Sequence, residues 1–208
     1  MKKNDAINII NILKDTYPDA QCSLDFETPF QMVVAVMLSA QCTDDRVNKT
    51  TPALFDRCKT IEDFANIDIN ELEDIIHPCG FYKNKAKSIV DTANIIVNKF
   101  NGNVPDNMKD LCTLKGIGRK SSNIILQECF NRTEGIAVDT HVTRISRKIG
   151  FSNGKSQIEI EKELMNKFDK KYWSVINHVL VYHGRKICIA NRPNCDICPI
   201  NTICKKNK

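Results

Sequence analysis

Only the last four of the ten cysteines in this 208-residue chain are clustered. They lie in the stretch CIANRPNCDICPINTIC, residues 188–204, with the spacing C-x6-C-x2-C-x5-C. Four thiolates this close in sequence are typical ligands of zinc or of an iron–sulfur cluster. Zinc modules usually contain two C-x2-C pairs, whereas this stretch has one, and ferredoxin spacings do not match it either. The spacing therefore predicts a metal centre and leaves the metal open.

A pair of glycines, Gly116 and Gly118, separates two expected helices in LKGIGRKSSNIILQECF, residues 114–130. Because glycine has no side chain, the backbone can turn tightly there and approach another surface closely. The amides of this turn and of the following helix then point the same way, as a phosphate-binding site requires. Basic residues on both sides, Lys115 and Arg119 among them, favour DNA. A plain corner between two helices is the alternative.

Lys120 lies in the first turn of the helix expected to begin near Arg119. The positive end of the helix dipole and the neighbouring guanidinium both disfavour an ammonium group there. They favour the neutral amine, which is the form that can act as a nucleophile. A solvated or phosphate-contacting lysine is the more common arrangement, and sequence alone favours it.

Asp139 follows a short apolar run in IAVDTHVTRISRKIGF and precedes a helix expected to end near Gly150. Local rules predict a helix N-cap at Asp139, whatever the function of the protein. His141 is expected to be a structural hydrogen-bonding residue, with a phosphate contact as the alternative. Arg144 adds positive charge to the same helix.

The bulk composition is that of an ordinary globular protein, with 42% hydrophobic and 26% charged residues. The net charge of +5 permits a nucleic-acid partner without requiring one. The longest unbroken apolar run, Met32 to Leu38, is too short to span a bilayer, and the N-terminal stretch has helical periodicity interrupted by polar residues. We therefore expect a cytoplasmic protein with no membrane partner.

Helical periodicity dominates the chain, and the sequence has neither low-complexity tracts nor a repeat of fixed period. Pro29 starts a stretch that is apolar nearly all round, which predicts a buried helix over 29–41. With glycine and proline at the breaks, we expect an all-α chain of about ten short helices, at 5–17, 29–41, 44–57, 60–66, 70–77, 83–100, 107–113, 119–131, 140–149, 156–168 and 171–184.

These motifs, taken in order, resemble the endonuclease III family, the bifunctional DNA glycosylase/AP lyases of base excision repair. The resemblance rests on LKGIGRK, on VDTH about twenty residues further on, and on the cysteine spacing at the end of the chain. LSAQCTD (residues 38–44), GFYKNKAKSI (residues 80–89) and HGRKIC before the cysteines also match. Each motif is modestly specific, but the ordered set covers nearly the whole chain and is highly specific.

The resemblance implies an all-α fold of two helical domains that flank a DNA-binding cleft. Residues 22–133 would form a six-helix domain with the helix–hairpin–helix, and residues 1–21 plus 134–208 would form an iron–sulfur cluster domain. The implied partner is double-stranded DNA that contains damaged pyrimidines or abasic sites. The protein would be a monomer, cytoplasmic and associated with the nucleoid when bound to DNA.

The resemblance also implies roles for individual residues. Lys120 would be the nucleophile that attacks C1′ of the damaged nucleotide, forming a Schiff base, and β-elimination would then cleave the strand 3′ of the site. Asp139 would help to activate the lysine and stabilise positive charge on the sugar. Gln41 would fill the gap left by the extruded nucleotide. The 4Fe-4S cluster would be held by Cys188, Cys195, Cys198 and Cys204. The remaining DNA contacts would come from Phe81, Lys115, Gly116, Gly118, Arg119, His141, Arg144 and Arg192.

The chain departs from the family pattern at several positions. Lys115 stands where proline is usual, Phe81 where a leucine wedge is common, and Cys42 where a small residue is usual. The loop between the first two clustered cysteines has one basic residue, Arg192.

Two other functions stay open. A monofunctional mismatch glycosylase would share the fold but lack a lysine at the position of Lys120, and it would carry a further C-terminal domain. A non-catalytic DNA-binding or structural protein would hold zinc in its cysteines.

Overall fold

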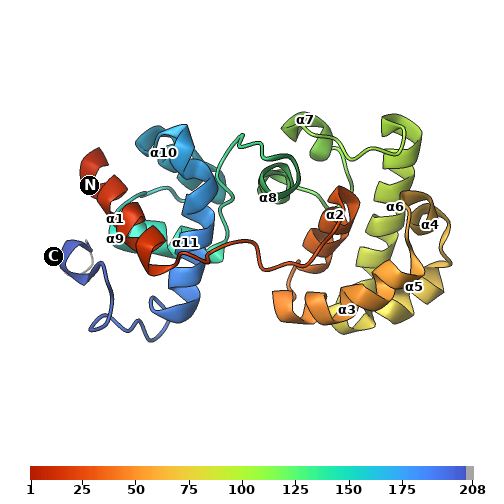
Figure 1. Cartoon of the computed structure of the whole chain (residues 1–208), viewed down its shortest axis with the longest axis horizontal. Helices are drawn as coiled ribbons and strands as arrows, with labels where there is room; N and C mark the ends of the chain where they lie inside the picture. The colour runs from red at the N-terminus through yellow and green to blue at the C-terminus, as the bar shows by residue number, and fades with distance from the viewer. Residues whose placement is uncertain (205–208) are drawn as a thin grey trace. The chain divides into compact units, whose positions relative to one another are not determined.

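The computed structural model describes residues 1–204, and this part of the chain is helical, with eleven α-helices and three short 3₁₀ segments. The chain forms two compact units. One contains Ser23–Arg132, and the other combines Met1–Cys22 with residues 133–204, so that two segments far apart in the sequence belong to it (Figure 1). The predicted all-α fold is confirmed. Within residues 1–204, no helix is both long and apolar enough to cross a membrane.

The unit Ser23–Arg132 is built around a helix that is buried on all sides. This helix, α2, has eight buried residues among its ten, from Phe30 to Leu38, with Gln31 as the exception inside that stretch. It packs against the helices α3, α6 and α8. The helices of the unit are α2 (Pro29–Leu38), α3 (Asp44–Arg57), α4 (Ile61–Asn66), α5 (Ile69–Ile76), α6 (Tyr82–Phe100), α7 (Met108–Leu111) and α8 (Arg119–Phe130).

Helix α2 begins at the predicted residue, Pro29, and ends at Leu38, three residues before the predicted end. Thr28 caps it by accepting a hydrogen bond from the Gln31 amide, and Pro29 is its first residue. At its end the Ser39 hydroxyl donates to the Val36 carbonyl, at 2.9 Å. Gln41 has a φ of 53°, a left-handed conformation that cannot continue a helix. The expected helix to residue 41 was therefore wrong, and Gln41 lies in the turn between α2 and α3.

The second unit is a bundle of four helices and the cysteine-containing segment. Its helices are α1 (Lys3–Thr16), α9 (Thr140–Ile149), α10 (Gln157–Lys167) and α11 (Trp173–Lys186). Helix α11 packs against both α1 and α9 (Figure 1). A Cβ atom at Gly184 would lie only 2.8 Å from Cδ1 of Ile145 and 2.7 Å from Nδ1 of His141. The absence of a side chain at Gly184 therefore permits the close approach of α11 to α9.

Candidate active site and metal centre

The glycine hairpin joins α7 to α8. Gly116 has a φ of 74°, which favours glycine, whereas a Cβ atom there would make only ordinary contacts with neighbouring side chains. The Ile117 amide donates to the Leu114 carbonyl at 3.2 Å, which closes the turn. The Thr92 hydroxyl of α6 donates to the Lys115 carbonyl at 3.1 Å and ties the hairpin to the unit.

Lys120 lies on the exposed side of this hairpin, in the first turn of α8. Lys115, Gly116, Gly118 and Arg119 are exposed with it. The N-cap of α8 is Gly118, and no side chain caps the helix there. The amides and the positive dipole end of α8 therefore lie beside the lysine, next to a surface that a phosphate could approach.

Asp139 is the N-cap of α9, as the sequence predicts. Its Oδ1 accepts a hydrogen bond from the Val142 amide at 2.7 Å, and the residue is half-buried. The segment before it is fixed by Asn177 of α11, whose side-chain amide donates to the Ala137 carbonyl at 2.7 Å. Asp139 belongs to the unit that carries the four cysteines, and Lys120 belongs to the other unit.

His141 and Arg144 of α9 make contacts inside their own unit. The Arg144 guanidinium donates to the carbonyls of Gly184 and Cys188, and it lies 3.3 Å from Nδ1 of His141. Burial lowers the pKa of His141, the Asp139 carboxylate opposes this, and the guanidiniums of Arg144 and Arg185 add to it. The structural role expected for His141 fits these contacts.

Gln41 and Phe81 lie in one unit and share an unusual backbone. Both are exposed and both have left-handed φ values, 53° for Gln41 and 49° for Phe81. The Phe81 side chain is 64% exposed although it is aromatic, and it directly precedes α6. Such a conformation in a bulky residue is strained and is held by its surroundings.

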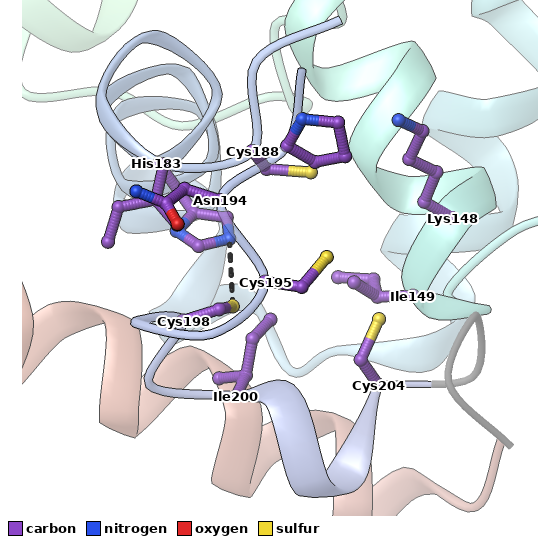
Figure 2. A pocket seen from close by; sticks show the side chains of 11 residues that line it. Lys148, Ile149, His183, Cys188, Asn194, Cys195, Cys198, Ile200 and Cys204 are labelled. Atoms are coloured by element: carbon purple, nitrogen blue, oxygen red, sulfur yellow. Dashed lines mark hydrogen bonds between the residues drawn. The ribbon is translucent and has the colours of Figure 1, made fainter. Parts of the chain in front are cut away.

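The four clustered cysteines line one cavity, which has an empty volume of about 380 Å³, part of it open to solvent (Figure 2). All four thiols are free and half-buried, and Ile149, Ile187 and Ile200 contribute apolar wall. Arg192 is exposed in the loop between Cys188 and Cys195. Within residues 1–204, no three His, Cys, Asp or Glu side chains are gathered as the ligands of one metal ion.

One of the four sulfurs, that of Cys198, lies where negative charge is disfavoured. Burial raises the pKa of the Cys198 thiol, and the other three thiolates raise it further, although the Ile200 amide donates to it and opposes them. A positive group beside Cys198 would therefore favour its thiolate form.

Side chains that the sequence did not single out surround the cysteines. His183 is buried at the end of α11, with Nε2 at 3.8 Å from Sγ of Cys198 and Nδ1 at 3.0 Å from the Tyr17 hydroxyl. Burial, followed by the charge of Arg144, lowers the pKa of His183 to about 4, so its ring is neutral at pH 7. Nε2–H can then donate to sulfur while Nδ1 accepts from Tyr17. The motif HGRKIC, which places His183 five residues before Cys188, was the available signal.

Comparison with known proteins identifies the family. Residues 34–170 match the HhH-GPD superfamily of base excision DNA repair proteins. The chain is 44% identical to endonuclease III of Synechocystis sp. over 203 residues, which covers 98% of this chain and 93% of that protein. It is 42% identical to endonuclease III of Bacillus subtilis over 195 residues, which covers 93% of this chain and 89% of that protein. The chain belongs to the endonuclease III family.

Solved structures agree with this assignment. A trapped endonuclease III–DNA covalent intermediate matches with a TM-score of 0.94 and 38% identity, covering 100% of this chain and 97% of that chain. A thermostable thymine-DNA glycosylase matches with a TM-score of 0.87 at 17% identity and shares the fold. As a member of the endonuclease III family, the chain is a base excision repair DNA glycosylase and AP lyase that acts on damaged pyrimidines. The predicted family, fold class and activity are confirmed.

The left-handed backbone at Phe81 predicts opposite effects of two neighbouring substitutions on stability. Phe81→Gly removes strain of about 1–2 kcal/mol at the cost of extra chain entropy, so we expect a net gain of up to about 1 kcal/mol. Gly80→Ala places a side chain at φ 65° and ψ 157°, so we expect a loss of about 1–3 kcal/mol. Urea unfolding followed by circular dichroism measures both. A clear loss of stability in Phe81→Gly would show that the backbone at Phe81 is not strained.

Proposed function

We propose that Lys120 is the nucleophile of the glycosylase and lyase reactions and that the DNA partner is double-stranded DNA containing damaged pyrimidines or abasic sites. The proposal is carried by one observation: the exposed Lys120 amine lies at an uncapped helix start behind the Gly116–Gly118 hairpin. The match to a chain trapped as a covalent intermediate with DNA supports it, because such an intermediate needs a nucleophile on the protein and a lysine amine can serve as one.

The steps follow from amine chemistry. Nζ of Lys120 forms a bond to C1′, and the bond from C1′ to the damaged base breaks, with the electron pair and a proton leaving on the base. The sugar ring opens to a Schiff base. Loss of a proton from C2′ then breaks the C3′–O bond and expels the 3′ phosphate. Water hydrolyses the Schiff base, which releases an unsaturated aldehyde and restores the lysine.

We propose that Asp139 acts on this reaction through its carboxylate charge. Its Oδ1 caps α9, so the same side chain can hold the helix and still present Oδ2 to the substrate. A fixed carboxylate would stabilise the positive charge that develops on the sugar as the base leaves. The helix cap fixes the position of the carboxylate, which keeps the cost of orienting it low.

The proposed DNA contacts fall into three groups. Lys115, Gly116, Gly118 and Arg119 would bind phosphate through amides and positive charge, and Arg192 would add a phosphate contact from the cysteine loop. Gln41 and Phe81 would enter the duplex, where an exposed aromatic ring can separate base steps. The contacts proposed for His141 and Arg144 rest on the family resemblance alone. We further propose that the enzyme is a monomer that works in the cytoplasm, on nucleoid DNA.

Endonuclease III proteins generally carry a 4Fe-4S cluster, and we propose that this chain holds one through Cys188, Cys195, Cys198 and Cys204. The cavity supports the proposal because its thiols surround a space, and in a cubane cluster each thiolate binds a different iron atom. The electrostatics of Cys198 also support it, because burial raises the pKa of this thiol and a bound metal would favour its thiolate form. The bound cluster would supply structural cross-links for the segment that carries Arg192, while the reaction takes place at the DNA.

Removal of the Lys120 amine should abolish covalent trapping. We expect Lys120→Ala to lower the yield of borohydride-trapped complex on abasic-site DNA by at least about 100-fold, because no other group forms the Schiff base. Lys115→Ala is the matched control on the same hairpin, and it should trap DNA while binding it more weakly. A Lys120→Ala protein that traps as well as the unaltered enzyme would contradict the assignment.

Asp139→Asn separates the charge of Asp139 from its capping role. Asparagine caps a helix about as well as aspartate, so the free energy of unfolding should change by less than about 0.5 kcal/mol. Without the carboxylate charge, single-turnover base excision should fall by roughly 100-fold while DNA binding stays within about threefold. Asp139→Ala, which removes the cap as well, should cost about 1 kcal/mol of stability. Equal losses of binding and excision in Asp139→Asn would assign only the structural role.

The cluster predicts the metal content of the purified protein. We expect a brown protein with broad visible absorbance and about four iron and four sulfide ions per chain. Cys198→Ser should lose that absorbance and lower the thermal stability, because the buried sulfur is one of the four ligands. Cys112→Ser, at an exposed thiol of the other unit, is the control and should keep both. A colourless protein with stoichiometric zinc would overturn the cluster.

A further inference from the structure

Lys85 is a buried lysine that the proposed reaction does not use. It lies in the first turns of α6, and the residue is only 7% exposed. Its ammonium nitrogen donates to the carbonyls of Leu38 and Cys79, at 2.8 Å each. A buried charge is costly unless hydrogen bonds replace its water shell, and these carbonyls do so here. Burial lowers the pKa of Lys85, and the thiols of Cys42 and Cys79 oppose this.

The two carbonyls lie just before two different segments, the turn that contains Gln41 and the segment that contains Phe81. Leu38 is the last residue of α2, and the turn that follows it contains Gln41. Cys79 is the last residue of the short 3₁₀ helix η1 (His77–Cys79), and Gly80 and Phe81 follow it. One ammonium group therefore joins the start of the Gln41 turn to the start of the Phe81 segment.

Other side chains link the same two segments. The thiol of Cys79 is hydrogen-bonded to the thiol of Cys42, the neighbour of Gln41. The Arg46 guanidinium of α3 reaches the Pro78 carbonyl at 3.4 Å. These contacts lie close in sequence to the two left-handed residues, Gln41 and Phe81. A left-handed conformation in glutamine or phenylalanine persists only when the surrounding structure enforces it.

We propose that Lys85 is a positioning residue for nucleotide extrusion, which holds the Gln41 turn and the Phe81 segment in one fixed arrangement so that both enter the duplex together. The inference rests on the DNA contacts proposed above for Gln41 and Phe81. Extrusion of a nucleotide opposes base stacking, and side chains that are already in place lose less freedom when they fill the gap. Lys85 acts through the two backbone segments and does not touch the DNA.

Two substrates separate this role from a general structural one. Lys85→Met keeps the length of the side chain and removes the N–H donors. On a damaged pyrimidine in matched duplex DNA, we expect its single-turnover excision rate to fall roughly tenfold. On an abasic site in single-stranded DNA, where no stacked duplex has to be opened, we expect a change of less than about threefold. Lys85→Arg, which keeps charge and donors, should recover part of the loss, and Lys99→Met, at an exposed lysine of the same helix, should behave as the unaltered enzyme.

A double-mutant cycle shows whether Lys85 acts through the two segments. The variant with Gln41→Ala and Phe81→Ala should itself have a lower rate of excision on duplex DNA. Adding Lys85→Met to this variant should then lower the rate by less than about a further twofold. Independent, multiplicative losses would overturn the positioning role, as would equal losses of Lys85→Met on both substrates. If Gln41→Ala and Phe81→Ala have no effect on duplex excision, the proposed DNA contacts fail instead. Lys85→Gln is carried through the same cycle, so that the outcome does not depend on the folding of one variant.

Discussion

The burial of α2 is the constraint on which the unit Ser23–Arg132 depends. A helix that is apolar on every side must be enclosed by other helices, and each Val, Leu or Met side chain removed from water contributes about 1.5–3 kcal/mol. Its neighbours α3, α6 and α8 each begin at a segment with a proposed role. Helix α3 follows the Gln41 turn, α6 follows Phe81, and α8 begins at Arg119 beside Lys120. Packing around one helix therefore fixes the start of three functional segments.

The second unit combines an apolar core with the segment that carries the four cysteines. Its apolar core comes from both ends of the chain and joins α1 to α11. The cysteine segment leaves α11 beside this core, where its thiols are partly buried and where burial raises the pKa of the Cys198 thiol. The neutral ring of His183 and the guanidinium of Arg144 both lie against proposed ligand residues, Cys198 and Cys188. Such contacts orient metal ligands and partly offset the charge of their sulfurs.

The local signals in the sequence located most elements, because caps and glycines act over a few residues. Thr43 and Cys58 bound α3 at the expected 44–57, and Asp139 and Gly150 bound α9 at the expected 140–149. The end of α2 was missed because the left-handed backbone at Gln41 has no local sequence signal, since glutamine rarely adopts this conformation. The buried state of Lys85 could not be predicted for the same reason, since its acceptors are backbone carbonyls that carry no sequence signal. The contact of Arg144 with the cysteine segment likewise depends on the space left by Gly184.

The left-handed residues distinguish structural from functional strain. Among the residues that the structure describes, four other than glycine have positive φ. Asn101 and Asn131 are the C-caps of α6 and α8, where asparagine is tolerated because its short polar side chain suits this conformation. Gln41 and Phe81 have no such local reason, and both side chains remain exposed. Surrounding contacts hold this strain while the aromatic ring stays in solvent, which gives no evident gain in packing. The proposed entry of both side chains into a duplex opened at a damaged base would give the strain a functional reason.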